Sequence, residues 1–263
     1  MTCPLARWHD RRVRRLRPVT APLPADTGRR DGLAYTLWLP ADGQAPTGGV
    51  VILHGAGSCK ESHHDYARAA IAAGFAAIAF DQRGHGASDG PMDGRAIDDV
   101  AAIAEVLRSS LGGPGAPIAL RGSSMGGYLA IMAAACARAS AVVAICPASP
   151  EGLRRGLHTG TFRFDADVPA LDPLLECSDL HAAVRSLEIP LLLLHAEGDE
   201  RVPVEHSREL ATHTRVAASR LIAVPGGHHR SLQHDPELQA LSLRFVGRAF
   251  TLSRGSHEPF RNR

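Results

Sequence analysis

Short apolar runs that alternate with amphipathic segments constrain the fold of this chain more than any other feature of its sequence. Runs such as 49–53 (Gly-Val-Val-Ile-Leu) are rich in β-branched residues and have the length of buried strands. Segments such as 95–110 repeat apolar residues at helical spacing. The alternation predicts an α/β fold with a mostly parallel, doubly wound sheet flanked by helices. We expect strands at 32–39, 49–53, 75–80, 117–121, 141–146, 190–195 and 221–224, and helices at 63–74, 95–110, 124–137, 205–217 and 236–252.

Two breaks in this alternation suggest how the chain is organised. Residues 1–30 are basic and then proline-rich, which is typical of a tail that leads into the first strand. Residues 150–188 carry charges, prolines and only short apolar groups, and we interpret them as a small cap insertion. The remainder of 31–252 forms one domain, and 253–263 is expected to be a C-terminal tail.

Charge and hydropathy exclude several classes of function. A formal net charge of +2 gives no general case for binding nucleic acid. No window approaches the ~18 uninterrupted apolar residues of a membrane span, and no apolar segment near the N-terminus resembles a secretory signal. We therefore expect a cytoplasmic protein without a nucleic-acid partner. The exception is a basic cluster near the N-terminus, which we expect to be solvated: Arg7, Arg11, Arg12, Arg14, Arg15 and Arg17.

The cysteines and histidines do not have the spacing of a metal site. Five cysteines without a CxxC pair indicate neither a disulfide framework nor a zinc site, and Cys136 and Cys146 lie in apolar stretches typical of the core. His63-His64 and the group His228, His229 and His234 are the alternatives for a metal site. No acid or cysteine stands at zinc-ligand spacing beside them, so we expect no metal.

The strongest chemical signal is the motif Gly122-Ser123-Ser124-Met125-Gly126, which fits G-x-S-x-G. It follows a predicted strand and opens a predicted helix. In that context, the two glycines permit a sharp turn that exposes the central serine. The pattern predicts Ser124 as a nucleophile.

A second glycine-rich turn, His54-Gly55-Ala56-Gly57, follows the predicted strand 49–53. Such a turn can aim a backbone N–H at a developing oxyanion. We expect the N–H groups of Ala56 and Met125 to form an oxyanion hole.

An acid and a base follow later strands in the order that completes a triad. Asp199 follows the strand 190–195, with Glu197 and Glu200 as alternatives. A histidine at 228 or 229 follows the last strand, and the spacing alone leaves both open. The order Ser, Asp, His, each after a strand, indicates a serine hydrolase.

These motifs together resemble the α/β-hydrolase superfamily, and more narrowly its small bacterial esterase, dienelactone-hydrolase-like and lysophospholipase-like members. The resemblance covers about 32–252. The glycines and Asp81 of the loop 81–88 suit a tightly turned, hydrogen-bonded loop, so we expect this loop to have a structural role despite its His85. One departure is that dienelactone hydrolases carry a cysteine where this chain has Ser124. The matching motifs are His54-Gly55, Asp81-x-Arg83-Gly84-x-Gly86-x-Ser88, the serine motif, Gly198-Asp199-x-x-Val202-Pro203 and Pro225-Gly226…His229.

The resemblance also implies the base and the reaction. Family loops of the form Pro-Gly-x-x-His place the histidine four residues after Pro225, which selects His229, although a Gly-His pattern would select His228. We expect a Ser124–Asp199–His229 triad that hydrolyses a small-molecule ester or thioester through an acyl-enzyme, without a cofactor.

Other functions stay open on the sequence alone. The same triad could cleave amides or transfer acyl groups, and a non-catalytic ligand-binding protein could use the same scaffold. Within the cap, Arg154, Arg155 and Arg163 could receive an acidic substrate group, although a solvated face is the simpler account.

Overall fold

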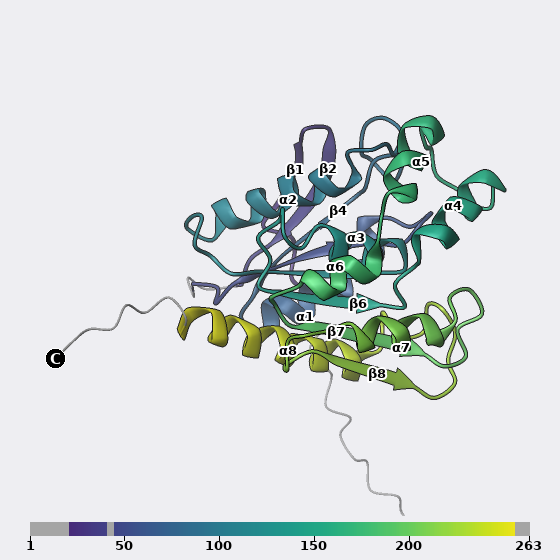
Figure 1. Cartoon of the computed structure of the whole chain (residues 1–263). Coiled ribbons are helices and arrows are strands. Elements are labelled where there is room, and N and C mark those ends of the chain that lie inside the picture. The colour runs from purple at the N-terminus through teal and green to yellow at the C-terminus, as the bar shows by residue number, and fades with distance from the viewer. Residues whose placement is uncertain (1–20, 41–44, 256–263) are drawn as a thin grey trace, which may run out of the picture.

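A single eight-stranded sheet organises the described residues, 21–40 and 45–255, of the computed structural model (Figure 1). The strand order is β1-β2-β4-β3-β5-β6-β7-β8. Strands β3 to β8 run parallel, while β2 is antiparallel to both of its neighbours, β1 and β4. The predicted mostly parallel sheet is confirmed. The strands are β1 Asp26–Arg30, β2 Leu33–Trp38, β3 Gly49–Leu53, β4 Ala76–Phe80, β5 Ile118–Ser123, β6 Ala141–Ile145, β7 Leu191–Ala196 and β8 Arg220–Val224.

Helices cover both faces of this sheet, as expected of a doubly wound fold (Figure 1). Apolar residues of α2, α3, α6 and α7 pack on one face, and those of α1 and α8 pack on the other. None of the helices in the described part of the chain is long and apolar enough to span a membrane. The helices are α1 His64–Ala72, preceded by the 3-10 turn Lys60–His63, then α2 Ala96–Ser110, α3 Met125–Met132, α4 Pro150–His158, α5 Val168–Glu176, α6 Leu180–Ser186, α7 Val204–Thr212 and α8 Pro236–Gly255.

Alternation along each central strand divides the core into two clusters. In β3, Val51 and Leu53 belong to the cluster under α2 and α3, whereas Val50 and Ile52 belong to the cluster under α1 and α8. Successive side chains of a strand point to opposite faces, so a strand with helices on both sides must be apolar throughout. This is why the buried strands appear in the sequence as continuous apolar runs.

The N-terminal boundary differs from the prediction, because 26–30 form strand β1 rather than part of a tail. This segment is mostly exposed and lacks an apolar pattern, so periodicity could not reveal it. It is an edge strand, joined to β2 by the two-residue turn Asp31-Gly32, where both φ angles are positive (51° and 84°). An Asp-Gly pair is a known hairpin signal. Residues 1–20, with their basic cluster, lie outside the described residues.

Three helix ends also differ from the prediction, and one of them is that of α7, which ends at Thr212 rather than at 217. The helix expected at 124–137 ends at Met132, and Cys136 is exposed rather than part of the core. Cys146 is buried, as expected. At the other end, α8 continues to Gly255, into the predicted tail, of which residues 256–263 are outside the described part.

The predicted insertion, 150–188, contains three helices with two roles. Helices α4 and α5 pack against each other, with Leu153, Leu171 and Leu175 buried and an ion pair between Arg154 and Asp172 at 2.9 Å. Helix α6 packs against α3 in the body of the domain. Helices α4 and α5 therefore form one packed pair, and the cap stays a prediction for this segment.

The central strands should tolerate loss of side-chain volume poorly. Leu193 in β7 is 1% exposed, so Leu193→Ala removes packed methyl groups and leaves a cavity. We expect the free energy of unfolding to fall by about 2–5 kcal/mol. Urea denaturation measures this loss. Leu23→Ala is the matched control, because Leu23 is 83% exposed and its truncation should change stability little. Equal effects of the two changes would contradict this account of the core.

Candidate active site

Ser124 occupies a strained turn between β5 and α3. Its φ of 55° and ψ of −118° are unusual for a residue with a side chain. Neighbouring backbone holds this conformation. The Ser124 N–H donates to Ile145 O at 2.9 Å, and its carbonyl accepts from the N–H groups of Tyr128 at 3.0 Å and Ala148 at 3.1 Å. The turn is thus tied to the end of β6 as well as to its own helix.

Two glycines make this turn sterically possible. A Cβ at Gly122 would lie 2.0 Å from Gly126 O, and a Cβ at Gly126 would lie 2.4 Å from Leu53 O. Both distances are far below a van der Waals contact with backbone that cannot easily move. The glycines of the motif therefore allow α3 to approach both β5 and β3, which explains the spacing seen in the sequence.

Asp199 and His229, from the loops after β7 and β8, meet through a direct hydrogen bond. The His229 Nδ1 lies 2.7 Å from Asp199 Oδ2. The second carboxylate oxygen, Oδ1, accepts from the backbone N–H groups of Arg201 at 2.8 Å and Val202 at 2.9 Å. A second imidazole, that of His195, lies 3.5 Å from Oδ2. Asp199 is therefore surrounded by donors.

This environment keeps the Asp199 carboxyl ionised. Burial opposes its charge, but hydrogen bonds from His195 and His229, and then from the N–H groups of Val202 and Arg201, outweigh that effect. Together they hold the pKa of Asp199 well below its ordinary value. A carboxylate that stays charged can orient a neighbouring imidazole and stabilise its protonated form.

The alternative acids and the alternative base have other partners. Glu197 pairs with Arg208 at 2.7 Å. Glu200 accepts the backbone N–H of His229 at 3.1 Å and so braces the loop rather than the ring. His228 is exposed and its Nδ1 accepts from Arg230 N at 3.3 Å. Of the candidate acids and bases, only Asp199 and His229 form a side-chain hydrogen bond with each other in the described residues.

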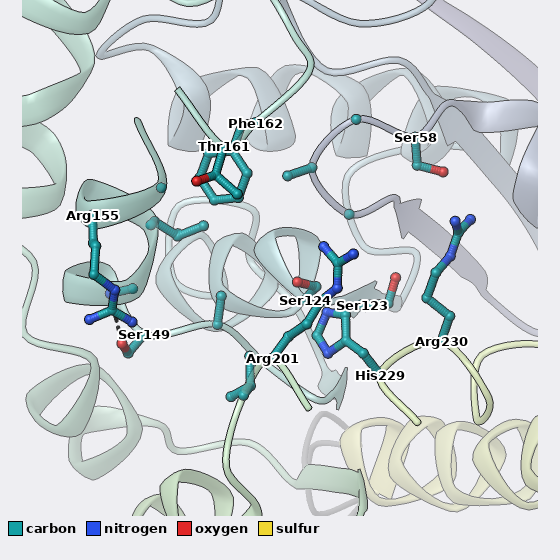
Figure 2. A pocket seen from close by; sticks show the side chains of 18 of the residues that line it. Ser58, Ser123, Ser124, Ser149, Arg155, Thr161, Phe162, Arg201, His229 and Arg230 are labelled. Atoms are coloured by element: carbon teal, nitrogen blue, oxygen red, sulfur yellow. Dashed lines mark hydrogen bonds between the residues drawn. The ribbon is translucent and has the colours of Figure 1, made fainter. Parts of the chain in front are cut away.

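A cavity of about 700 Å³ lies at the carboxyl ends of the strands and contains both Ser124 and His229 (Figure 2). Its far wall comes from α4 and the segment that follows, including Leu153 and Phe162. The predicted cap thus lines the same cavity as the serine. In α/β sheets, ligands bind at this edge.

The loop predicted to hold the oxyanion hole borders this cavity. Ala56 lines it, and Met125 follows Ser124 as the first residue of α3. The loop is held from behind, since Gly57 N donates to His85 Nε2 at 3.0 Å. His54 accepts from Gln82 N at 3.1 Å through its Nε2. His85 therefore supports the loop, in agreement with the structural role expected for 81–88.

Asp81 is the centre of that supporting loop. Its carboxylate accepts from the backbone N–H of Lys60 at 2.7 Å and from the Ala87 N–H at 2.8 Å, and it pairs with the Lys60 ammonium at 2.7 Å. A Cβ at Gly86 would lie 2.2 Å from this carboxylate. The motif around Asp81 therefore forms a compact turn that fixes the loops next to the serine.

The histidines considered as metal ligands are not gathered into one site. Among the described residues, two groups bring ligand atoms within 4.8 Å of one another: Cys146, Asp199 and His229, and His181, Glu209 and His213. The first is the Asp199–His229 pair with a buried thiol behind it. His63, His64, His228 and His234 belong to neither group. His63 instead lies against Arg121, with Nδ1 and Nη1 3.0 Å apart.

Only one of the three cap arginines considered from the sequence reaches the cavity. Arg155 lines it, whereas Arg154 pairs with Asp172 and Arg163 is not among the lining residues. Two other arginines do line it, Arg201 and Arg230. The expectations drawn from the sequence assign no role to either of them, although Arg201 is two residues from Asp199 and Arg230 follows His229 directly.

Comparison with known sequences agrees with the motif pattern. A family model described as serine aminopeptidase, S33 matches residues 44–157. The uncharacterized protein YfhR of Escherichia coli O157:H7 is 27% identical over 216 residues, which cover 76% of this chain and 70% of that protein. YfhR of Escherichia coli K12 matches to the same extent.

Solved structures with the same architecture include esterases and lipases. Est1E from Butyrivibrio proteoclasticus, solved with ferulic acid, matches with a TM-score of 0.67 and 21% identity over 88% of this chain and 100% of that one. A soluble variant of monoglyceride lipase from Saccharomyces cerevisiae matches with a TM-score of 0.68 and 16% identity over 88% and 98%. The monoacylglycerol lipase of Paleococcus ferrophilus matches with a TM-score of 0.63 and 21% identity over 83% of this chain and 98% of that one. At these identities the likeness establishes the fold, which is the expected α/β-hydrolase fold.

The close approach at Gly126 makes it intolerant of any side chain. Gly126→Ala places a methyl group against Leu53 O, so we expect stability to fall by about 1–3 kcal/mol and Ser124 to be displaced. Urea denaturation and the rate of Ser124 labelling by a fluorophosphonate measure the two effects. Gly115→Ala is the control, because a Cβ there meets nothing within 4 Å. A Gly126→Ala chain that matches this control in both measurements would refute the steric argument.

The buried His54 makes stability depend on pH. Burial, and then the nearby His85, lower the pKa of His54 from 6.5 to about 4. The unfolded chain therefore binds more protons than the folded chain between these values, and stability falls as the pH falls from 6.5 to 4. We expect His54 to account for about 3 kcal/mol of this loss, at 1.36 kcal/mol per pKa unit.

The comparison with His54→Gln isolates this effect, because Gln can still accept the Gln82 N–H but does not titrate. Urea denaturation at pH 7 and pH 4 should show a smaller loss of stability for His54→Gln than for the unchanged chain. Parallel losses in the two chains would mean that His54 is not the group that takes up the proton.

Proposed function

We propose that this chain, which has the α/β-hydrolase fold and matches a serine aminopeptidase family model over residues 44–157, is a serine hydrolase that cleaves carboxylic esters or thioesters through an acyl-enzyme. One arrangement carries the proposal. Ser124 in its strained turn and the His229 imidazole, hydrogen-bonded to Asp199, open into one cavity. A nucleophile, a base and a group that orients the base are the parts that acyl transfer requires.

The reaction follows from these parts. His229 takes the proton of the Ser124 hydroxyl as its oxygen attacks the acyl carbonyl, while the Nδ1–H of His229 donates to Asp199. The N–H groups of Ala56 and Met125 bind the resulting oxyanion. His229 then protonates the leaving alcohol or thiol as the bond to it breaks. Water, deprotonated in turn by His229, releases the acid and restores the serine.

The low pKa of Asp199 suits this role. An ionised Asp199 keeps the proton of the neutral imidazole on Nδ1, so that Nε2 is free to accept from the serine. It also stabilises the imidazolium that forms during attack. The donors around Asp199 make its charge permanent over the pH range in which most enzymes act.

The charge of the cavity favours an ester over a peptide substrate, although the matching family model is described as an aminopeptidase. An aminopeptidase must bind the positive α-ammonium group of its substrate, and a carboxylate is the usual partner. Of the described residues that line this cavity, three are arginines and none is Asp or Glu. Amide hydrolysis, acyl transfer to another acceptor and non-catalytic ligand binding are the alternatives that the test below separates. Location in the cytoplasm stays a prediction.

The proposal is tested by replacing Ser124 and His229 separately. Ser124→Ala should abolish labelling by a fluorophosphonate, and each change should lower kcat/KM on p-nitrophenyl esters by about 10³-fold, because the triad acts as a unit. Esters, acyl thioesters and amides with the same acyl group are compared in one assay, with hydroxylamine as an alternative acyl acceptor.

His228→Ala is the matched control, since His228 is the neighbouring exposed histidine of the same loop. It should retain most of the activity. A greater loss from His228→Ala than from His229→Ala, in folded variants, would transfer the role of base to His228. Absence of both labelling and hydrolysis in the unchanged chain would favour the non-catalytic alternative.

A further inference from the structure

We propose that the leaving group of the substrate carries a phosphate monoester, which Arg201 and Arg230 bind beside the base. This inference rests on the proposed ester hydrolysis and names the class of substrate. Its starting point is the charge of the cavity, which three arginines and no acidic residue line. The chain as a whole is nearly balanced, with 29 Lys and Arg against 27 Asp and Glu. The excess of arginines among the residues that line the cavity therefore does not follow from the composition of the chain.

Few ion pairs within the described residues neutralise the three arginines that line the cavity. Arg154 is engaged by Asp172 at 2.9 Å, whereas no carboxylate of the described residues lies within ion-pair distance of its neighbour Arg155 or of Arg230. Within the described residues, the guanidinium group of Arg201 forms one ion pair, at 3.7 Å from Glu200, and both side chains are exposed. Such an exposed, distant pair holds an arginine weakly.

The backbone of the two arginines is fixed to the catalytic loops. The Arg201 N–H donates to Asp199 Oδ1 at 2.8 Å, and Arg230 follows His229 directly. The loops are themselves joined, since Gly198 N donates to Gly226 O at 2.9 Å. In Figure 2 the two side chains rise on either side of His229. The backbone of both arginines is therefore part of the same pair of joined loops as the base.

The position of the base identifies the part of the substrate that these arginines meet. His229 must reach the oxygen or sulfur of the leaving group in order to protonate it. The leaving group therefore departs next to His229, between Arg201 and Arg230. The apolar wall with Leu153 and Phe162, from the cap, is left for the acyl group.

A phosphate monoester matches two arginines best. It carries a charge of about −1.5 to −2 at pH 7 and three acceptor oxygens, so it can satisfy two guanidinium groups at once. A single carboxylate would leave one of the two positive charges unbalanced. The planar donors of arginine also fit phosphate in a bidentate geometry.

Matched substrates test this assignment. We compare 1-butyrylglycerol, its 3-phosphate and the butyryl ester of glyceric acid, which share the acyl group and differ in the charge of the leaving alcohol. We expect kcat/KM to be about tenfold or more higher for the phosphate than for the neutral ester, as charged hydrogen bonds predict. The preference should shrink between 20 and 300 mM NaCl, because salt screens exposed charges.

Variants then locate the phosphate. Arg201→Gln and Arg230→Gln retain the backbone and each should lower the ratio of kcat/KM for the phosphate to that for the neutral ester, and the double variant should bring this ratio close to one. Arg244→Gln is the control, because Arg244 is an exposed arginine of α8 outside the cavity. The Arg244→Gln chain should have the same ratio of kcat/KM for the phosphate to kcat/KM for the neutral ester as the unchanged chain.

Other outcomes overturn the inference in distinguishable ways. Equal hydrolysis of the phosphate and the neutral ester would refute the phosphate subsite and leave the proposed function standing. A preference for the glyceric acid ester would assign a carboxylate instead. A preference for p-nitrophenyl hemisuccinate over p-nitrophenyl butyrate, without one for the phosphate, would place the anion on the acyl side.

A binding measurement separates failure of this inference from failure of the proposed function. If no ester is hydrolysed, calorimetric titration of the unchanged chain with glycerol 3-phosphate still reports on the subsite. Binding that is lost in the Arg201→Gln/Arg230→Gln chain and kept in Arg244→Gln supports the subsite. Binding that is absent, or equal in all three chains, rejects it.

Discussion

The close approach of backbone at the Ser124 turn is the constraint on which the rest of the structure depends. Helix α3 can begin directly after β5 only if nothing projects from Gly122 or Gly126, because these residues meet each other and the end of β3. The resulting positive φ of Ser124 is held by hydrogen bonds to β6 and to the segment after it. These neighbouring backbone segments thus share one geometry, and none of them can shift without disturbing the serine.

Parallel strands then bring the other reactive groups to the same place. Because β5, β7 and β8 run in one direction, their carboxyl ends lie along one edge of the sheet, and the loops that follow them lie side by side. Asp199 links two of these loops through its hydrogen bonds to His229 and to the backbone of its own loop. The low pKa of its carboxyl is a consequence of these hydrogen bonds. The same contacts therefore hold the two loops together and keep Asp199 ionised.

The cavity depends on the cap as much as on the sheet. Helix α4 and the segment after it supply an apolar wall opposite the loop that carries His229. The cap leucines Leu153, Leu171 and Leu175 belong to the same core cluster as Met125 and Tyr128 of α3, and the Arg154–Asp172 pair joins α4 to α5. The cap therefore contributes an apolar wall and Arg155 to the cavity, and the loops after β7 and β8 contribute Arg201 and Arg230.

The residues of the proposed triad could be predicted from the sequence because their chemistry coincides with a local pattern. Ser124 stands between required glycines after a strand, and Asp199 and the histidine pair each follow an apolar run. Strand β1 could not be found in the same way. It lies at the edge of the sheet and buries little, so it has no apolar alternation, and only the Asp31-Gly32 turn marked it. Cys136 was misplaced because an apolar neighbourhood does not reveal where a helix ends.

By itself, the sequence determined the α/β architecture, the order of the strand-end motifs and the candidate serine, acid and base, because periodicity and turn chemistry are local. Only the tertiary structure decided between neighbours. His229 rather than His228 contacts Asp199, and Arg155 rather than Arg154 lines the cavity beside Arg201 and Arg230. Residues one position apart have the same local pattern, and the direction in which each side chain points depends on loops that meet through the folded sheet.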